Sequence, residues 1–400
     1  MTNPSPAVPV VRLSAYYFFY FMAMGALLPY WSPYLQSVGF NAVQLGQLGA
    51  MLSATKILAP YIWGSIGDHT GQRIKIIRLA SLLSIICFAG VFLQPLFTSP
   101  AFWWMLAITF FYSFFWNANL PQFEVVTLEY LDKRSERYTR IRLWGSVGFI
   151  ISVVLMGYLH ERFGVANLPY LVIGIYLAIF FNSLVIRQRV IKKDVQPLSI
   201  VPVLRRPEVM ALLTLCFLVQ LSHGPYYTFF SIYMAELGYS NAVIGWLWTP
   251  GILVEILVFL VMPRWLQWMG AKNILILTML CMVLRWLLIA YASDNLMVVI
   301  FAQTLHAMTF GAYHAIMVLM IFRYFPGRLQ GRGQALYSSL SFGLGSAVGA
   351  FASGYLWSWF DPQVTFVAAA GVAVIGLFWV VRMQLPELYP RPVRMAKTEA

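Results

Sequence analysis

The fold is decided by three apolar stretches, which read GILVEILVFLVM at 251–262, LTMLCMVLRWLLIAY at 277–291 and FAQTLHAMTFGAYHAIMVLM at 301–320. Ionisable side chains stand near their middles, namely Glu255, Arg285, His306 and His314. A charged side chain at bilayer depth costs roughly 3 kcal/mol on insertion scales, so these groups must pair with one another or contact water. Intramembrane groups of this kind are typical of proton relays and solute sites.

The composition extends this interpretation to the whole chain. Of 400 residues, 60% are hydrophobic and only 10% are charged, whereas an ordinary soluble domain carries about 25% charged residues. The apolar residues form blocks of roughly 20, the length of a helix that crosses a bilayer. Strict alternation in ten-residue segments, which would indicate a membrane barrel, is absent from the sequence. The sequence therefore predicts an all-α polytopic membrane protein, with the lipid bilayer as its first partner.

The net charge of +13 is not interpreted as a nucleic-acid signal, because the basic residues are unevenly placed. Nearly all Lys and Arg fall in one set of loops, tails and helix ends, while the alternate short loops at 36–42 and 94–100 carry no charge. Lys56 and Arg285 lie within spans, and Arg162 falls on the opposite side. This positive-inside bias predicts that both termini are cytoplasmic.

Hydropathy predicts twelve spans in two halves. A basic, proline-containing stretch at 188–207 separates the sixth span from the seventh and is typical of a linker. The predicted organisation is an N-terminal six-helix half at 1–187, a cytoplasmic linker at 188–207, a C-terminal six-helix half at 208–384 and a cytoplasmic tail at 385–400. The predicted spans are 12–35, 43–66, 74–94, 101–122, 143–160, 168–187, 208–235, 242–262, 273–291, 296–322, 333–356 and 363–383.

The N-terminal half carries its own intramembrane charges. Lys56 lies well inside the second span, either as a point charge for an anionic solute or as one partner of a structural ion pair. Asn117 and Glu124 lie in the fourth span and Arg142 begins the fifth, so Glu124 and Arg142 can meet as a bidentate pair. That pair is either part of a substrate site or an interfacial ion pair, the role predicted for the nearby Glu129.

The C-terminal half carries the candidate proton path. A carboxyl group held away from water favours its neutral form, so Glu255 is the predicted proton carrier. His306 is the predicted relay or second carrier, Arg285 the cation that favours ionised Glu255, and His314 a weaker member of the group. Isolated intramembrane histidines are often packing residues.

Three further candidates lie in the seventh span. His223, Tyr226 and Tyr227 flank Pro225, where a proline kink frees backbone groups. An aromatic solute can stack on the tyrosines. These three residues complete the predicted substrate site.

Other chemistries have little support in the sequence. Cys87, Cys216 and Cys281 lie inside spans without a metal or redox spacing, so we interpret them as small buried residues. No phosphate-binding loop, zinc spacing or nucleophile motif is present. We therefore expect neither an enzyme nor a metal site, and no cofactor beyond a proton gradient as the energy source.

The loop after the second span resembles a family motif. It reads GSIGDHTGQR at 64–73, and its matching residues are Gly64, Asp68, Gly71 and Arg73. With the two parallel six-helix repeats, this loop resembles the major facilitator superfamily, whose fold places the solute site near the membrane midplane. The resemblance implies a gating loop whose Asp68 accepts hydrogen bonds at the cytoplasmic seam in one state and loses them in another. A solvated turn is the alternative.

A second resemblance concerns the charged residues. Asn117, Glu124 and Arg142 are similar to the sugar-site region of the lactose permease family, and Glu255, Arg285 and His306 are similar to its proton-coupling residues. Thr309 stands where that family has a second carboxylate, and Phe149 replaces its sugar-stacking Trp. These departures imply a different solute and a changed proton path.

The stretch from 220 to 340 most resembles the phenylpropionate permease family. The matching segments are His223–Tyr227, Gly238–Trp248, Val283–Trp286, Leu305–His306 and Gln334–Ser338, together with Glu255 and His314. This resemblance implies proton symport of a small anionic aromatic carboxylate into the cell, by a monomer in the bacterial inner membrane. A sugar or nucleoside symporter is the alternative, followed by an exporter or a non-transporting membrane sensor.

Overall fold

The computed structural model describes residues 8–96, 101–131, 137–187 and 199–386. Part of the predicted linker (188–198) and most of the predicted tail (387–400) therefore lie outside the described residues. The described part is helical throughout, without a strand. The helices before residue 188 are α1 (Val10–Ser37), α2 (Ala42–Thr70), α3 (Arg73–Ala89), η1 (Gly90–Leu96), α4 (Phe102–Leu131), α5 (Tyr138–Phe163), η3 (Val165–Asn167) and α6 (Leu168–Leu184).

The helices of the C-terminal half include two π-helical turns. The elements are α7 (Val201–Leu204), α8 (Pro207–Glu236), α9 (Asn241–Leu247), α10 (Thr249–Tyr291), α11 (Leu296–Thr304), η4 (Ala307–Ala312), α12 (Tyr313–Tyr324), η5 (Gly327–Leu329), α13 (Gln330–Ser338), η6 (Ser339–Gly345), α14 (Ser346–Trp359) and α15 (Pro362–Arg382). The π-helical turns are η4 and η6.

Nine segments of the described chain are long and apolar enough to cross a membrane. One of them, Asn241–Tyr291, contains α9 and α10, and Gly270 breaks α10 into two helices with a φ of 77°. Helices α2 and α4 are 29 and 30 residues long but are not among the nine. Their polar residues, Lys56, Asn117 and Glu124 among them, lower their hydropathy. The exact count of twelve crossings stays a prediction.

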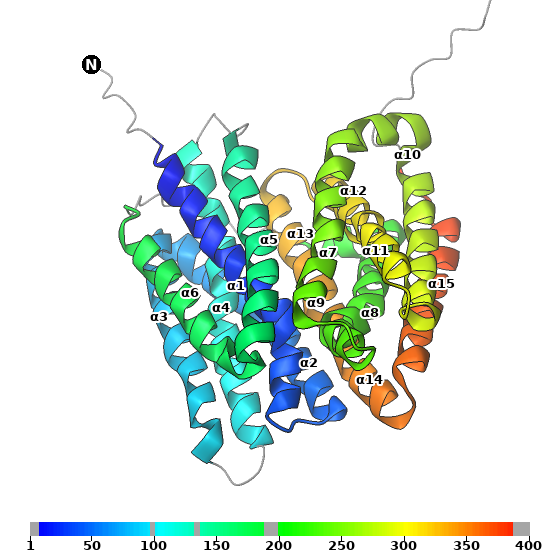
Figure 1. The fold of residues 1–400 in the computed structure, drawn as a ribbon. Helices are drawn as coiled ribbons and strands as arrows, with labels where there is room; N and C mark the ends of the chain where they lie inside the picture. The colour runs from blue at the N-terminus through cyan, green and yellow to red at the C-terminus, as the bar shows by residue number, and fades with distance from the viewer. Residues whose placement is uncertain (1–7, 97–100, 132–136, 188–198, 387–400) are drawn as a thin grey trace, which may run out of the picture.

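The buried residues form two apolar cores. One draws on α1 to α6 and takes Phe229 and Ile232 from α8, and the other draws on α8 to α15 and takes Phe149 and Val153 from α5. Figure 1 shows the corresponding helix groups side by side. We call α1–α6 the N-terminal half and α7–α15 the C-terminal half, while their boundaries as domains stay a prediction.

The same helix-end contact occurs in both halves. Arg78 of α3 donates hydrogen bonds to the carbonyls of Ser183, Leu184 and Ile186 at the end of α6. In the C-terminal half, Lys272 of α10 donates to the carbonyl of Val381 near the end of α15. A basic side chain suits the unpaired carbonyls and the negative pole of a helix C-terminus. The contact repeats because the two halves repeat.

Closely packed glycines join the halves at one end of the helices. A Cβ on Gly46 of α2 would lie 2.7 Å from the carbonyl oxygen of Ala350 and 2.8 Å from Cα of Gly354 in α14. Likewise, a Cβ on Gly157 of α5 would lie 2.6 Å from the carbonyl oxygen of Asn241. Small residues let helix backbones approach this closely. This joined end lies at the start of α2 and the end of α14, away from the 64–73 loop.

Candidate functional site

Arg285 is the centre of the polar cluster in the C-terminal half. It is fully buried, and its guanidinium lies 4.2 Å from the ring centre of Tyr226 and 4.6 Å from that of Trp286. Its Nη1 donates to Thr309 Oγ1 at 3.1 Å, and its Nη2 donates to Gln303 Oε1 at 3.1 Å. These contacts are to neutral groups, so they hold the cation without neutralising its charge.

His306 stands between Arg285 and Glu255. Arg285 Nη1 lies 3.1 Å from His306 Nδ1, and His306 Nε2 lies 3.9 Å from Glu255 Oε2. Since a guanidinium has only donors, Nδ1 must accept, and the ring proton of a neutral His306 then sits on Nε2, facing Glu255. The predicted influence of Arg285 on Glu255 therefore passes through His306 in this conformation.

Two glycines make room for these side chains. A Cβ on Gly251 would lie 2.8 Å from Cβ of His306, and a Cβ on Gly311 would lie 2.7 Å from Cγ of Glu255. The glycine on α10 thus faces the histidine, and the glycine on η4 faces the glutamate. This reciprocal packing lets two polar side chains fit between close helices.

The three candidates on α8 surround the same cluster. Tyr226 donates to Gln303 Oε1 at 2.9 Å, and His223 donates from Nδ1 to the carbonyl of Val219 at 2.8 Å. The ring of His223 stacks on that of Tyr227 at 5.8 Å. The structure therefore brings all three toward Arg285 and Trp286. Pro225 lies inside α8, which continues through it.

Gln303 and Thr309 are polar contacts that the sequence analysis did not assign to the site. They lie three residues before and three residues after His306, a spacing that puts them on the same side of a helix. The three-residue spacing from His306 could have indicated both residues from the sequence alone.

His314 belongs to a different set of contacts. Its Nδ1 lies 2.8 Å from the hydroxyl of Tyr337, and its ring stacks on Phe310 at 5.8 Å. Phe310 also stacks on His306 at 5.2 Å. The two histidines are therefore linked through an aromatic ring, and sequence reasoning assigned neither Phe310 nor Tyr337 a role.

In the N-terminal half, Asn117 and Lys56 have different surroundings. Asn117 is buried in a network between α2 and α4, where its Nδ2 donates to Thr55 Oγ1 at 2.9 Å and Thr55 donates to Ser113 Oγ at 2.9 Å. The neighbouring Lys56 is only partly buried. Within the described ranges no carboxylate comes within ion-pair distance of Lys56, so the predicted structural ion pair is not formed in this conformation.

Glu124 and Arg142 do not make the direct pair that we expected. Glu124 Oε1 accepts a 3.4 Å hydrogen bond from Tyr138, and the Arg142 guanidinium lies 3.9 Å from the ring centre of Phe21. Gly145 leaves room for the guanidinium above the Phe21 ring, because a Cβ at this position would lie 2.7 Å from Phe21 and 2.8 Å from Arg142 Nη1. The guanidinium therefore gains a cation–π contact instead of the carboxylate.

Arg142 connects the two halves electrostatically. Its guanidinium is within the range of electrostatic interaction with Glu124 of its own half and with Glu255 and His314 of the other half. The candidate groups of the two halves thus face a common region. Within the described residues, no group of three or more His, Cys, Asp or Glu is placed to hold a metal ion.

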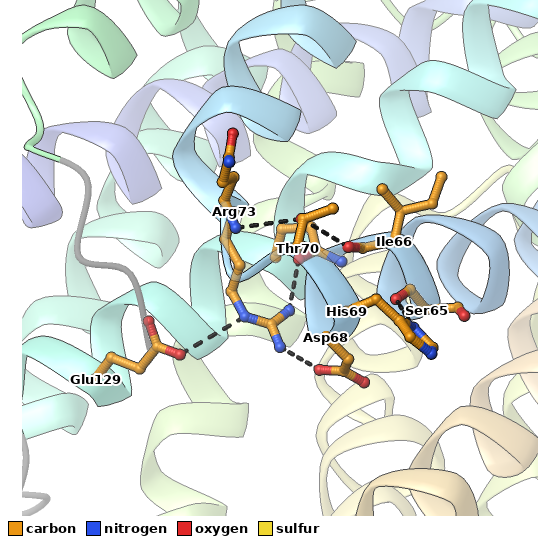
Figure 2. A network of polar contacts seen from close by, with 9 residues as sticks. Ser65, Ile66, Asp68, His69, Thr70, Arg73 and Glu129 are labelled. Carbon is orange, nitrogen blue, oxygen red and sulfur yellow. Dashed lines mark hydrogen bonds and ion pairs between the residues drawn. The ribbon is translucent and has the colours of Figure 1, made fainter. Parts of the chain in front are cut away.

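Residues 64–70 of the predicted loop are the last turns of α2, and only Gly71 and Gln72 lie between α2 and α3. Arg73, the first residue of α3, fixes this segment (Figure 2). Arg73 pairs with Asp68, its Nε lies 3.6 Å from Glu129 Oε1, and its Nη1 donates to Gln122 Oε1 at 2.6 Å. Gly71 ends α2 with a φ of 66°, a conformation that favours glycine. Glu129 thus contributes an ion pair to this segment, and its predicted place at the membrane interface stays a prediction.

These loop contacts lie within the N-terminal half, on α2, α3 and α4. Gly67, which has no predicted role, leaves space for them, because a Cβ there would lie 2.5 Å from Gln122 Oε1 and 2.9 Å from Arg73 Nη1. Gly64, by contrast, has open space around it. The predicted role of the loop in gating stays a prediction.

Comparison with known proteins identifies the family. A family model described as MFS_1 like matches residues 10–368. The chain belongs to this family. It is 28% identical over 399 residues to a probable 3-phenylpropionic acid transporter of Escherichia coli (strain K12), covering 94% of this chain and 95% of that one. It is 25% identical over 373 residues to a maltose permease of Geobacillus stearothermophilus, covering 90% of this chain and 91% of that one.

The fold is also that of solved transporters in this superfamily. A crystal structure of a mutant nucleoside transporter, NupG, matches with a TM-score of 0.83 at 16% identity, covering 94% of this chain and 99% of that one. The major facilitator fold predicted from the sequence is therefore confirmed. The family and its structural neighbours are transporters and not enzymes, and this chain is a multi-pass membrane transporter.

Proposed function

We propose that this protein is a proton-coupled symporter that carries a small aromatic carboxylate into the cell. The observation that supports this most is that three cations within the described helices lack a carboxylate partner. Lys56, Arg142 and Arg285 each stand beyond ion-pair distance of every carboxylate in the described residues. Unpaired positive charge within membrane-spanning helices is costly, most of all at Arg285, which is fully buried, and less at Lys56 and Arg142, which are partly buried. An anionic solute offsets this cost.

The charge balance of the site favours a monoanion. The candidate residues within the helices include three cations, Lys56, Arg142 and Arg285, and two carboxylates, Glu124 and Glu255, so the set carries one excess positive charge when both carboxylates are ionised and the histidines are neutral. A neutral sugar or nucleoside brings no charge to offset this excess. The similarity to the probable 3-phenylpropionic acid transporter points to the same solute class.

The position of Arg142 suggests how proton and solute are coupled. Arg142 interacts through space with Glu255, so ionised Glu255 competes with a solute carboxylate for this cation. A proton on Glu255 removes the competitor and strengthens solute binding, and by linkage the bound solute strengthens proton binding. Joint binding is the requirement for symport.

The proposed orientation follows from the basic residues. With both termini in the cytoplasm of a bacterial inner membrane, the end joined by Gly46, Gly354 and Gly157 is the extracellular one. The structure then represents a conformation closed toward the outside. Solute entry requires these glycine contacts to separate.

The same fold in the nucleoside transporter NupG supports a second candidate, transport of a nucleoside. Uptake into proteoliposomes separates the two. We expect labelled 3-phenylpropionate to accumulate at acid outside pH and a protonophore to abolish the accumulation. Uptake of a nucleoside or maltose, with no uptake of the carboxylate by folded protein, would contradict the proposal.

Variants of the cations sharpen the test. Hydrogen bonds to charged groups contribute roughly 1.5–3 kcal/mol, so Lys56→Gln or Arg142→Gln should raise KM for 3-phenylpropionate by roughly 10- to 150-fold. Lys75→Gln, which removes an exposed cation on α3, is the matched control and should leave KM unchanged. Equal effects of all three substitutions would show that bulk charge, rather than a solute contact, is being measured.

A further inference from the structure

Two π-helical turns occupy the centre of neighbouring helices in the C-terminal half. Among the described residues, η4 (Ala307–Ala312) lies between α11 and α12, and η6 (Ser339–Gly345) lies between α13 and α14. Single π-helical turns inside α-helices are rare and occur frequently at functional sites. The presence of a π-helical turn in each of these two helices indicates a functional role beyond helix packing.

Each π-helical turn carries a phenylalanine, and the two rings meet. Phe310 of η4 and Phe342 of η6 are both half-buried, and their ring centres lie 6.1 Å apart at an interplanar angle of 55°. This distance is within the range of a favourable aromatic pair. The two irregular turns thus place two adjacent rings that keep part of their surface exposed.

Surrounding residues hold the two rings in place. His306, Phe310 and His314 form a ladder whose successive ring planes are inclined by only 6° and 4°. Tyr337 contacts His314 through its hydroxyl at 2.8 Å and packs against Phe342 at 5.7 Å. Because the histidines cover both faces of Phe310, this ring presents its edge to an incoming molecule.

The rings lie close to the charges that the proposed function uses. A Cβ on Gly343, next to Phe342, would lie 3.3 Å from the backbone nitrogen of Ile57, the residue after Lys56. On the other side, His314 is within electrostatic range of Arg142, and His306 borders Glu255. The rings are therefore next to the region that both halves face, rather than on a surface turned only toward lipid.

We propose that Phe310 and Phe342 form the subsite for the planar ring of the solute. The solute's carboxylate faces the cations of the N-terminal half, and the face of its ring lies against the edge of Phe310, an edge-to-face contact that aromatic pairs favour. This inference rests on the proposed function and adds to it the residues that select an aromatic acid over an aliphatic one.

A pair of matched solutes tests the subsite. 3-Cyclohexylpropionate has the size and charge of 3-phenylpropionate but lacks the aromatic face. Aromatic pairs contribute about 0.5–1.5 kcal/mol beyond their buried area, so we expect the wild-type protein to prefer 3-phenylpropionate by about fivefold in KM. In Phe310→Leu and Phe342→Leu this preference should fall to about one, through a higher KM for the aromatic acid alone.

Control variants separate a solute contact from a folding defect. Phe310→Tyr retains the ring and should retain the preference, while Phe351→Leu makes the same change on an exposed ring of α14 and should leave both KM values unchanged. The subsite is refuted if Phe310→Leu and Phe342→Leu keep the preference, or raise both KM values equally. Failure of the wild type to transport either acid would instead refute the proposed function itself.

Discussion

The contact of Gly46 with α14 gives the most quantitative prediction. In Gly46→Ala the new methyl carbon would lie 2.8 Å from Cα of Gly354, about 0.7 Å inside the separation of roughly 3.5 Å at which carbon contacts become favourable. The near atoms are backbone, so helices α2 and α14 must separate. Overpacking of this kind costs roughly 1–3 kcal/mol, which shifts an equilibrium by roughly 5- to 150-fold. We therefore expect conformations with this end open to become more populated by that factor.

Alkylation of a buried cysteine measures the shift. Thr228 of α8 is 6% exposed and packs against Gly49 at the joined end. In a chain whose three native cysteines are replaced by Ala, Thr228→Cys should react with an impermeant maleimide several-fold faster when Gly46→Ala is added. Gly371→Ala is the matched control, because a Cβ there meets open space. An unchanged alkylation rate with Gly46→Ala would refute the reasoning that this glycine contact holds the end closed.

Two further predictions concern stability and Arg285. Gly67→Ala should lower the unfolding midpoint in detergent, because its Cβ would displace Gln122 Oε1 from the hydrogen bond with Arg73, and hydrogen bonds to charged groups contribute roughly 1.5–3 kcal/mol. Gly64→Ala, in open space, should not lower it, and equal shifts would contradict the account of this segment. Arg285→Lys keeps the positive charge but lacks the planar guanidinium that contacts Gln303, Thr309 and His306. Uptake should therefore fall about tenfold or more. Wild-type uptake by this variant would show that the guanidinium contacts are not required.

Hydropathy was sufficient to predict most helices, because crossing a bilayer needs a long apolar segment whatever its detailed packing. The predicted span 12–35 corresponds to α1 (Val10–Ser37), and 43–66 corresponds to α2 (Ala42–Thr70). Hydropathy predicts a fourth span at 101–122, whereas α4 continues to Leu131, since its last turns carry polar residues that pack inside the N-terminal half. Hydropathy registers the polarity of those residues but not the partners that bury them.

The candidate site shows where pattern reasoning stops. The sequence predicts that Glu255, Arg285 and His306 pair with one another or contact water, because a charged side chain at bilayer depth is costly. It did not show that His306 lies between the other two, which depends on rotamers and on the space left by Gly251 and Gly311. The π-helical turns could not be predicted either, since one extra residue per turn leaves the apolar pattern of a membrane span unchanged.

The measurement that tests the central claim most directly is uptake of labelled 3-phenylpropionate by proteoliposomes, comparing the wild-type protein with Glu255→Gln. The account predicts that the wild type concentrates the acid when the outside is acidic and stops doing so with a protonophore. Glu255→Gln should exchange labelled for unlabelled acid across the membrane but concentrate none, while Glu236→Gln, a change at the end of α8, behaves as wild type. Concentrative uptake by Glu255→Gln equal to that of the wild type would contradict the claim that Glu255 carries the proton.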